Sequence, residues 1–268
     1  MKRFKPFALC VTLLVASTSF AAQPAQPSAQ ALLAASDAIR NPAQSFGLTN
    51  TLIEYRDGKQ TDTSTLAIYA RADSKTGQFR NLIRFVSPQR DAGKLLLKNG
   101  NDLWFFDPAS KASVRISPQQ RLLGQAANGD VVTVNLSLDY TASLGGEETI
   151  DDGERQQRSS YRLDLKANNT EVTYHRIAYW IDRANSRPIK AKFYSASDRL
   201  LKTAYYRHFK LQLGIERPTE TVIIDGLDPK WVTVMRNSDL AYRDVPESWL
   251  QRDYLPRFNP EQATAQAQ

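Results

Sequence analysis

The sequence has very little cysteine and histidine, two residues that much enzyme chemistry uses. Its 268 residues include one cysteine and two histidines, and it lacks both a nucleophile elbow and a glycine-rich phosphate loop. His175 and His208 each stand alone in expected strands, without a second ligand at metal-binding spacing. The carboxylate pairs Glu147–Glu148 and Asp151–Asp152 could support a hydrolase only in a cleft, and after a Gly-Gly turn we interpret them as solvated. We therefore expect no catalytic residue, no metal site and no cofactor, and predict a protein that is not an enzyme.

Long hydrophobic runs are absent apart from one near the N-terminus. Phe7–Val15 is apolar, follows three basic residues and precedes small residues that end at Ala21. This arrangement predicts a secretory signal peptide that is cleaved after Ala21. A retained membrane anchor is the alternative, but the run is shorter than the roughly 20 residues that a spanning helix needs.

The only cysteine, Cys10, lies inside this apolar run. Leu9 precedes it and is too bulky for a lipidation motif, so we expect no lipid on Cys10. The mature chain then has no cysteine, which excludes disulfides and thiolate metal sites. A cysteine-free exported protein of this size is typical of a bacterial periplasm.

The sequence also lacks a strong excess of one charge. The net charge is +7, and loss of Lys2, Arg3 and Lys5 with the signal would lower it to about +4. No cluster of Lys and Arg with interleaved aromatics occurs, so we expect no nucleic-acid binding.

Short segments of alternating apolar and polar residues fill most of the chain. Turn dipeptides such as Asp57-Gly58 and Asn168-Asn169 separate them, and no linker or internal repeat interrupts them. This pattern predicts about eleven strands at hairpin spacing. Because twist accumulates in a large sheet, we predict a mainly β (α+β) fold in which one antiparallel sheet curls into a half-open barrel.

Three short segments are predicted to be helical and to cover the barrel. They are Ala31–Ile39, Pro118–Gln125 with Ser117 as its N-cap, and Pro246–Leu250. Asp130–Tyr140 is ambiguous, because its β-branched residues favour a strand while the residues before it could cap a helix. Helices this short are marginal alone, so we expect the first two to open more easily than the sheet.

The stretch from Asn99 to Pro108 is apolar on both faces of a predicted strand. Asn99-Gly100 predicts a hairpin turn before it. In an antiparallel sheet one such face must meet the core, and the other a lid, a partner or an apolar ligand. We expect Trp104 and Phe106 to face a ligand cavity, and Leu103 and Phe105 the opposite side, with ordinary core packing of the aromatics as the alternative.

Three motifs in this part of the chain resemble the LolA-like outer-membrane lipoprotein-sorting proteins. They are Asn101–Pro108, with its W-x-x-x-P strand, Ser113–Ser117 and Arg121–Gly124. The resemblance is strongest over residues 80–140, to a branch of larger family members. It implies a half-open barrel closed by helices, with an apolar concave face for acyl chains. The family's lid-tying Lys-Arg-Pro turn is replaced by Val86-Ser87-Pro88, so its arginine role is not carried over there.

The predicted cavity wall consists of nine apolar residues: Ile83, Phe85, Leu95, Leu97, Trp104, Phe106, Leu122, Leu123 and Trp180. Surface solvation is the default expectation for arginines on such strands, and four of them are candidates for contacts with a lid or an acidic partner: Arg80, Arg84, Arg115 and Arg121.

The predicted function is that of a soluble periplasmic carrier that binds acyl chains of a lipoprotein or lipid and moves them toward the outer membrane. The expected partners are an inner-membrane exporter and an outer-membrane receptor, and we expect a monomer. The alternative is a non-carrier interaction module, such as an accessory subunit of an envelope exporter. We expect a signal peptide at 1–21, a flexible N-terminus at 22–30, a LolA-like domain at 31–258 and a disordered tail at 259–268.

Overall fold

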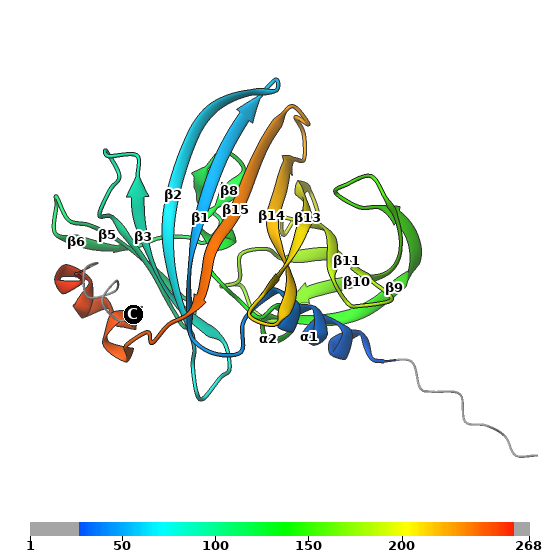
Figure 1. Cartoon of the computed structure of the whole chain (residues 1–268), viewed down its shortest axis with the longest axis horizontal. Helices are drawn as coiled ribbons and strands as arrows, with labels where there is room; N and C mark the ends of the chain where they lie inside the picture. Colours follow the sequence, from blue (N-terminus) through cyan, green and yellow to red (C-terminus); the bar gives the residue numbers. More distant parts are fainter. Residues whose placement is uncertain (1–26, 260–268) are drawn as a thin grey trace, which may run out of the picture.

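The computed structural model describes residues 27–259, and thirteen of their strands form one antiparallel sheet. Figure 1 shows that this sheet curls without closing. The prediction of a mainly β, half-open sheet is confirmed, although about eleven strands was too few. The predicted signal peptide, its cleavage site and Cys10 lie outside the described residues, as do residues 260–268.

The helices and strands follow one another in a simple order. They are α1 (Ala29–Arg40), β1 (Phe46–Arg56), β2 (Lys59–Ala72), β3 (Phe79–Ser87), β4 (Leu95–Asn99), β5 (Asp102–Asp107), β6 (Ala112–Arg115), β7 (Arg121–Leu123), β8 (Ala126–Ala127), η1 (Asn128–Asp130), α2 (Leu136–Asp139), β9 (Tyr140–Asp151), β10 (Gln157–Ala167), β11 (Arg176–Asp182), β12 (Pro188–Tyr194), β13 (Leu200–Gln212), β14 (Ile215–Asp225), β15 (Trp231–Tyr242), η2 (Glu247–Leu250) and η3 (Arg252–Arg257). None of the helices within residues 27–259 combines the length and the apolar character of a membrane-spanning helix.

The sheet consists of two meanders that meet in its middle. Its strand order is β6-β5-β4-β3-β2-β1-β15-β14-β13-β12-β11-β10-β9. The chain forms β1 to β6 as successive hairpins and then passes from the β6 edge to the β9 edge through residues 116–139. We call these residues the crossing segment. The second meander then returns strand by strand until β15 pairs with β1.

The crossing segment corrects one sequence prediction. Pro118–Gln125 was expected to be a helix, but Arg121–Leu123 and Ala126–Ala127 form the two-stranded sheet β7-β8. Gly124 turns between them with a φ of 54°, a conformation that favours glycine. A Cβ there would lie 2.3 Å from the Thr233 side-chain oxygen. The ambiguous stretch before Tyr140 has one helical turn, α2, and then enters β9.

The other two predicted helices are present. Helix α1 begins after Ser28, whose hydroxyl accepts the Ala31 N–H at 3.2 Å, and it buries Leu32 and Leu33. The predicted terminal helix is the 3-10 turn η2, in which Trp249 is 3% exposed.

The strand pair β4-β5 is buried on both faces, which explains its apolar sequence. Leu96 and Leu103 belong to the core on the concave face, together with α1 and the crossing segment. Leu97 and Phe106 belong to a second core, where η2 and η3 cover the convex face. The predicted hairpin is confirmed, but Asn99 pairs with Asp102 and the turn lies at Gly100, whose φ is 59°.

Candidate functional site

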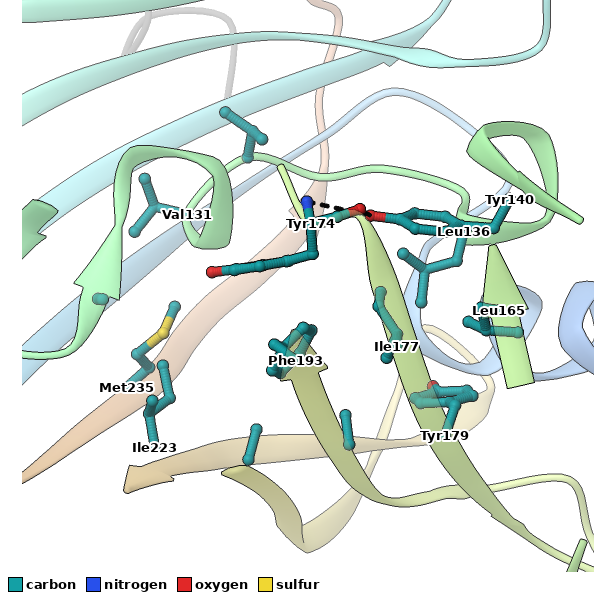
Figure 2. Close-up of a cluster of buried hydrophobic side chains, with 14 of the residues drawn as sticks. Val131, Leu136, Tyr140, Leu165, Tyr174, Ile177, Tyr179, Phe193, Ile223 and Met235 are labelled. Atoms are coloured by element: carbon teal, nitrogen blue, oxygen red, sulfur yellow. Dashed lines mark hydrogen bonds between the residues drawn. The ribbon is translucent and has the colours of Figure 1, made fainter. Parts of the chain in front are cut away.

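An apolar cavity of about 210 Å³ lies between the concave face of the sheet and the crossing segment. Both meanders and the crossing segment contribute to its wall. Figure 2 shows part of this wall, namely Val131, Leu136, Tyr140, Ile177, Phe193, Ile223 and Met235. These side chains are nearly all carbon surface, so this part of the cavity favours an apolar occupant.

A buried ion pair fixes the middle of the crossing segment to the sheet. Lys202 of β13, 3% exposed, forms an ion pair with Asp130 and also donates to the Gln125 carbonyl at 3.0 Å. The Tyr174 hydroxyl donates to the same carboxylate at 2.6 Å. Burial and the neighbouring Asp130 carboxylate raise the pKa of Tyr174, which keeps it a neutral donor.

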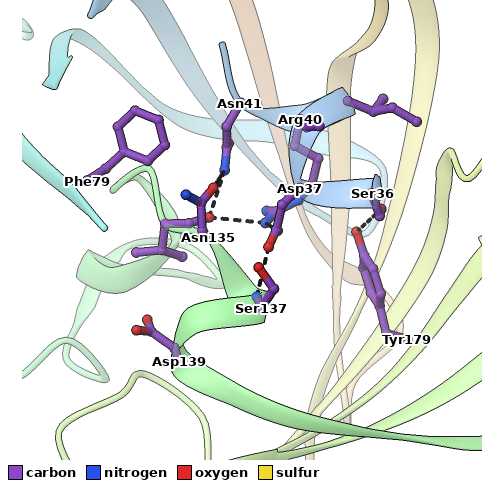
Figure 3. A network of polar contacts seen from close by, with 12 residues as sticks. Ser36, Asp37, Arg40, Asn41, Phe79, Asn135, Ser137, Asp139 and Tyr179 are labelled. Atoms are coloured by element: carbon purple, nitrogen blue, oxygen red, sulfur yellow. Dashed lines mark hydrogen bonds and ion pairs between the residues drawn. The ribbon is translucent and has the colours of Figure 1, made fainter. Parts of the chain in front are cut away.

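A separate polar network joins α1 to the end of the crossing segment. Figure 3 shows it around Asp37, which accepts the Ser137 N–H at 2.7 Å and an Arg40 N–H at 2.6 Å. Arg40 and Asn41 both donate to the Val134 carbonyl, at 3.1 and 2.9 Å. Helix α1 and residues 134–137 are therefore held to each other by hydrogen bonds around the cavity.

Polar side chains also line parts of the cavity. Arg217 is 3% exposed and donates to the carbonyls of Ala38 and Ile39, at the end of α1, at 3.0 and 2.6 Å. Burial lowers the pKa of Arg217. Elsewhere in the wall, burial lowers the pKa of Lys98 and raises that of Asp139, each opposed by the charge of the other.

The structure corrects the predicted cavity wall. Ile83 and Phe85, with the half-buried Leu122 and Leu123, join the concave core but do not line the cavity. The other five predicted residues lie in clusters on the convex face: Leu95, Leu97, Trp104, Phe106 and Trp180. Trp104 and Phe106 were expected to face the cavity, but Leu103 of the same strand lines it instead. Strand alternation correctly separated Trp104 and Phe106 from the other two residues, Leu103 and Phe105. Each pair was assigned to the wrong face, because η2 and η3 bury the convex side as well.

The four predicted arginines do not line the cavity either. Arg80 pairs with Glu247 of η2 and so holds the convex cover. Arg84 lies on the same face of β3 by strand alternation, and its buried Nε has no partner within residues 27–259. Arg121 stacks its guanidinium 4.1 Å from the centre of the Trp231 ring.

Arg115 connects the two meanders. It lies on the edge strand β6 and forms an ion pair at 3.1 Å with Glu171, which belongs to the connection between β10 and β11. Gln119 reaches the same connection and donates to the Val172 carbonyl at 2.9 Å. These contacts bridge the opening of the curled sheet on its surface.

Sequence reasoning missed the polar residues of the wall. Arg217 shares a face of β14 with Thr221 and Ile223, at the period of two that places alternate residues together. No residue of this strand was singled out from the sequence, so Arg217 was not considered. Extending the alternation of Ile223 and Thr221 back along the strand would have placed it beside the core.

A curled antiparallel sheet with a helix and an internal segment covering an apolar cavity defines the class of half-open β-barrel proteins. A family model described as an uncharacterized protein matches residues 77–257. The structure is similar to that of a LolA superfamily protein from Nitrosomonas europaea, with 34% identity and a TM-score of 0.77 over 85% of this chain and 100% of that chain. The chain belongs to the LolA superfamily, as its motifs predicted.

Two more distant structures share the fold. One is a DUF1329 family protein from Desulfovibrio piger, with 22% identity and a TM-score of 0.71 over 85% of this chain and 97% of that chain. The other is described as an outer membrane lipoprotein-sorting protein domain from Vibrio parahaemolyticus, with 19% identity and a TM-score of 0.71 over 85% of this chain and 98% of that chain. A search of curated proteins finds no match.

Proposed function

We propose that this protein is a periplasmic carrier that holds an acyl chain of a lipid or lipoprotein in its cavity and moves it toward the outer membrane. The observation that carries the proposal is the apolar cavity between the concave face and the crossing segment. Membership of the LolA superfamily supports it, as does the description of the Vibrio relative. On this proposal the protein binds and releases a ligand and carries out no chemistry.

The energy for binding comes from burial of the chain. Each methylene removed from water contributes about 0.8 kcal/mol. The cavity of about 210 Å³ is smaller than the roughly 300–1,000 Å³ of typical ligand pockets. A long chain therefore requires part of the cover to move away from the sheet.

Helix α1 and residues 134–137 are the part of the cover best suited to move. Hydrogen bonds join them to each other, while Lys202 fixes the middle of the crossing segment to the sheet. Moving them as a unit would break no strand pairing, but it would break their hydrogen bonds to the sheet, which are those from Arg217 to the end of α1 and between Ser36 and Tyr179. On this proposal an inner-membrane exporter loads the carrier and an outer-membrane receptor unloads it by binding the chain more tightly.

A cavity-filling substitution tests the proposal. Ala204 of β13 is 2% exposed and lines the cavity, whereas Ala178 of β11 is 5% exposed and packs on the convex face. Both Ala→Leu changes overpack a buried site and should cost about 1–3 kcal/mol of stability. We expect Ala204→Leu to weaken binding of a fluorescent fatty acid about tenfold or more and Ala178→Leu to leave it unchanged, because about 0.8 kcal/mol is lost for each methylene displaced.

Mass spectrometry of organic extracts provides an independent measurement. Purified wild-type protein should release a lipid, and the Ala204→Leu variant should release less. Wild-type protein that yields no lipid and binds no acyl probe would contradict the proposal. Equal loss of binding in both Ala→Leu variants would assign the effect to stability rather than to the cavity.

A further inference from the structure

One part of the cavity wall carries a positive charge without a carboxylate partner. Arg217 of β14 is 3% exposed, and its recorded contacts are the carbonyl oxygens of Ala38, Ile39 and Gln212. No carboxylate lies within ion-pair distance of it in residues 27–259. The partial negative charge at the end of α1 offsets only part of its charge.

The neighbouring arginine does not change this balance. Arg40, which also lines the cavity, forms an ion pair with the buried Asp37 at 2.6 Å. Its charge is therefore already compensated, and Arg217 leaves an excess of one positive charge. The Nε and Nη1 atoms of Arg217 have acceptors, whereas no acceptor in the described part of the chain reaches its Nη2, which is not fully buried and is therefore accessible to a ligand or to water.

A second buried polar group in the same wall lacks a partner. Asn50 of β1 is 2% exposed and donates to the Asn237 side chain of β15 at 2.6 Å, and its Oδ1 is buried without a partner in residues 27–259. Turning over both amides reverses this hydrogen bond, so that Asn237 donates to the Asn50 oxygen and Asn50 presents an unpaired N–H to the cavity. One polar atom of Asn50 is unpaired in either arrangement.

These residues lie on adjacent strands. The pairing of β14 with β15 ends at Glu220 and Arg236, and Arg217 and Asn237 lie just beyond that pair on their respective strands. Asn50 is the register partner of Asn237. All three line the cavity. A buried, uncompensated guanidinium is costly, and the buried unpaired atom of Asn50 is costly as well.

An anion would satisfy these groups together. Its oxygens could accept from the Arg217 Nη2 and from an Asn50 N–H, and its charge would balance the guanidinium. We propose that the ligand is an amphiphile with one anionic headgroup, a carboxylate or a phosphate, which Arg217 binds while the chain lies along Ile223 and Met235. The inference rests on the proposed carrier function and adds the chemical class of the cargo.

The surface beside this part of the cavity leaves room for a larger headgroup. Beyond the pair formed by Glu220 and Arg236, β14 and β15 are no longer hydrogen-bonded. A surface hollow next to this separation shares Gln212 and Asn237 with the cavity wall. A phosphate headgroup with a further substituent could project there, whereas a fatty acid needs only the Arg217 site.

Matched pairs of ligands test the inference. Decanoate is compared with decanol, and a lysophosphatidate with the monoacylglycerol of equal chain length, at neutral pH in a direct binding assay. Wild-type protein should bind the anion of at least one pair about tenfold or more tightly than its neutral partner, as expected for hydrogen bonds between charged groups. The pair with the larger ratio distinguishes a carboxylate from a phosphate headgroup.

The variants assign the preference to a residue. Arg217→Gln should reduce the ratio to near one while affinity for the neutral ligand changes little. Lys98→Gln removes one positive charge from the same wall, on β4, where Asp139 lies close to it, and should lower the ratio by a smaller factor than Arg217→Gln. Arg217→Lys should retain part of it, because the charge remains. Asn50→Leu should reduce it by a smaller factor.

The outcomes separate this inference from the proposed function. Equal binding of anionic and neutral ligands by wild-type protein would overturn the inference and leave the carrier function standing. A lack of binding by all four ligands would overturn the carrier function. Arg217 also caps α1, so Arg217→Gln could fail to fold. In that case the wild-type ratio and the Arg217→Lys and Lys98→Gln variants still decide whether Arg217 sets the preference for an anion. A ratio that Lys98→Gln removes and Arg217→Lys leaves intact would contradict the assignment to Arg217.

Discussion

The two faces of the sheet are both covered, but by different physical means. On the concave face, α1 and residues 134–137 are joined by hydrogen bonds around Asp37, and a cavity of about 210 Å³ lies beneath the cover. On the convex face, η2 and η3 pack aromatic rings onto the sheet. The Tyr69 and Trp249 rings are 5.5 Å apart, and those of Trp249 and Phe258 are 5.2 Å apart.

This difference indicates which cover can move. Moving α1 together with residues 134–137 keeps the hydrogen bonds between them and exposes Leu32 and Leu33 at roughly 25 cal/mol per Å², a cost that an acyl chain entering the cavity offsets. Opening the convex cover exposes apolar surface at the same cost per area and also breaks the close contacts between aromatic rings. We therefore interpret the convex cover as a permanent wall and the concave cover as a lid.

The largest expected effect comes from breaking the convex cover. Trp249→Ala should reduce the free energy of unfolding by about 3–5 kcal/mol, because it opens a space in a closely packed cluster. Binding of an acyl probe to the folded fraction should not change. Denaturant unfolding and a binding titration on the same sample check both parts. A variant that keeps its stability but loses the probe would reverse the roles of the two covers.

A smaller effect is expected from loosening the concave cover. Asp37→Ala removes the acceptor for Ser137 and Arg40, which should cost about 1–3 kcal/mol. Amide hydrogen exchange in α1 should become faster, while exchange in η2 and in β10 should not. Asp198→Asn is the control, since that carboxylate forms an ion pair with Arg176 but is 70% exposed and asparagine also tolerates the φ of 59° at this position; the change should have almost no effect. Equal acceleration throughout the chain would mean that α1 does not open separately.

The smallest effect is a pH dependence at the rim of the convex cover. The hydrogen bond from Arg80 lowers the pKa of Glu247 from its ordinary value of 4.5. The contribution of this pair to docking of η2 is therefore present above pH 4.5 and is lost as the pH falls through the lowered pKa. The indole NMR signal of Trp249 should shift over that range in wild-type protein. In Glu247→Gln the shift should be absent, and its persistence there would assign it to another group.

The alternation of residues predicted strands well and their buried faces poorly. In Leu95–Leu97 three leucines follow one another, so nothing in the local sequence distinguishes the cavity side from the convex side. The deciding contacts come from Trp249 and Leu250, about 150 residues later in the chain. The prediction of a docking terminal helix was correct, but it was not connected to β4 and β5.

The structure of the crossing segment and the polar residues of the cavity wall depend on contacts between distant parts of the chain, which local sequence patterns do not reveal. Residues 121–127 form a β-turn-β unit because Gly124 fits against Thr233, and their helix-like spacing gave no sign of this. Arg217 became a candidate only through its place opposite the end of α1. The family motifs predicted the barrel and its cavity, whereas the residues around the cavity required the structure.

The pairing of β1 with β15 has a consequence for how the chain acquires its structure. Each meander contains hairpins between neighbouring strands, which form quickly because little chain has to be closed. The junction between the meanders joins residues as far apart as Asn50 and Asn237, 187 positions along the sequence. Closing so long a loop is the slow step. Until β15 is made, β1 is an unpaired sheet edge, so the newly made chain should depend on a chaperone until its last strand is available.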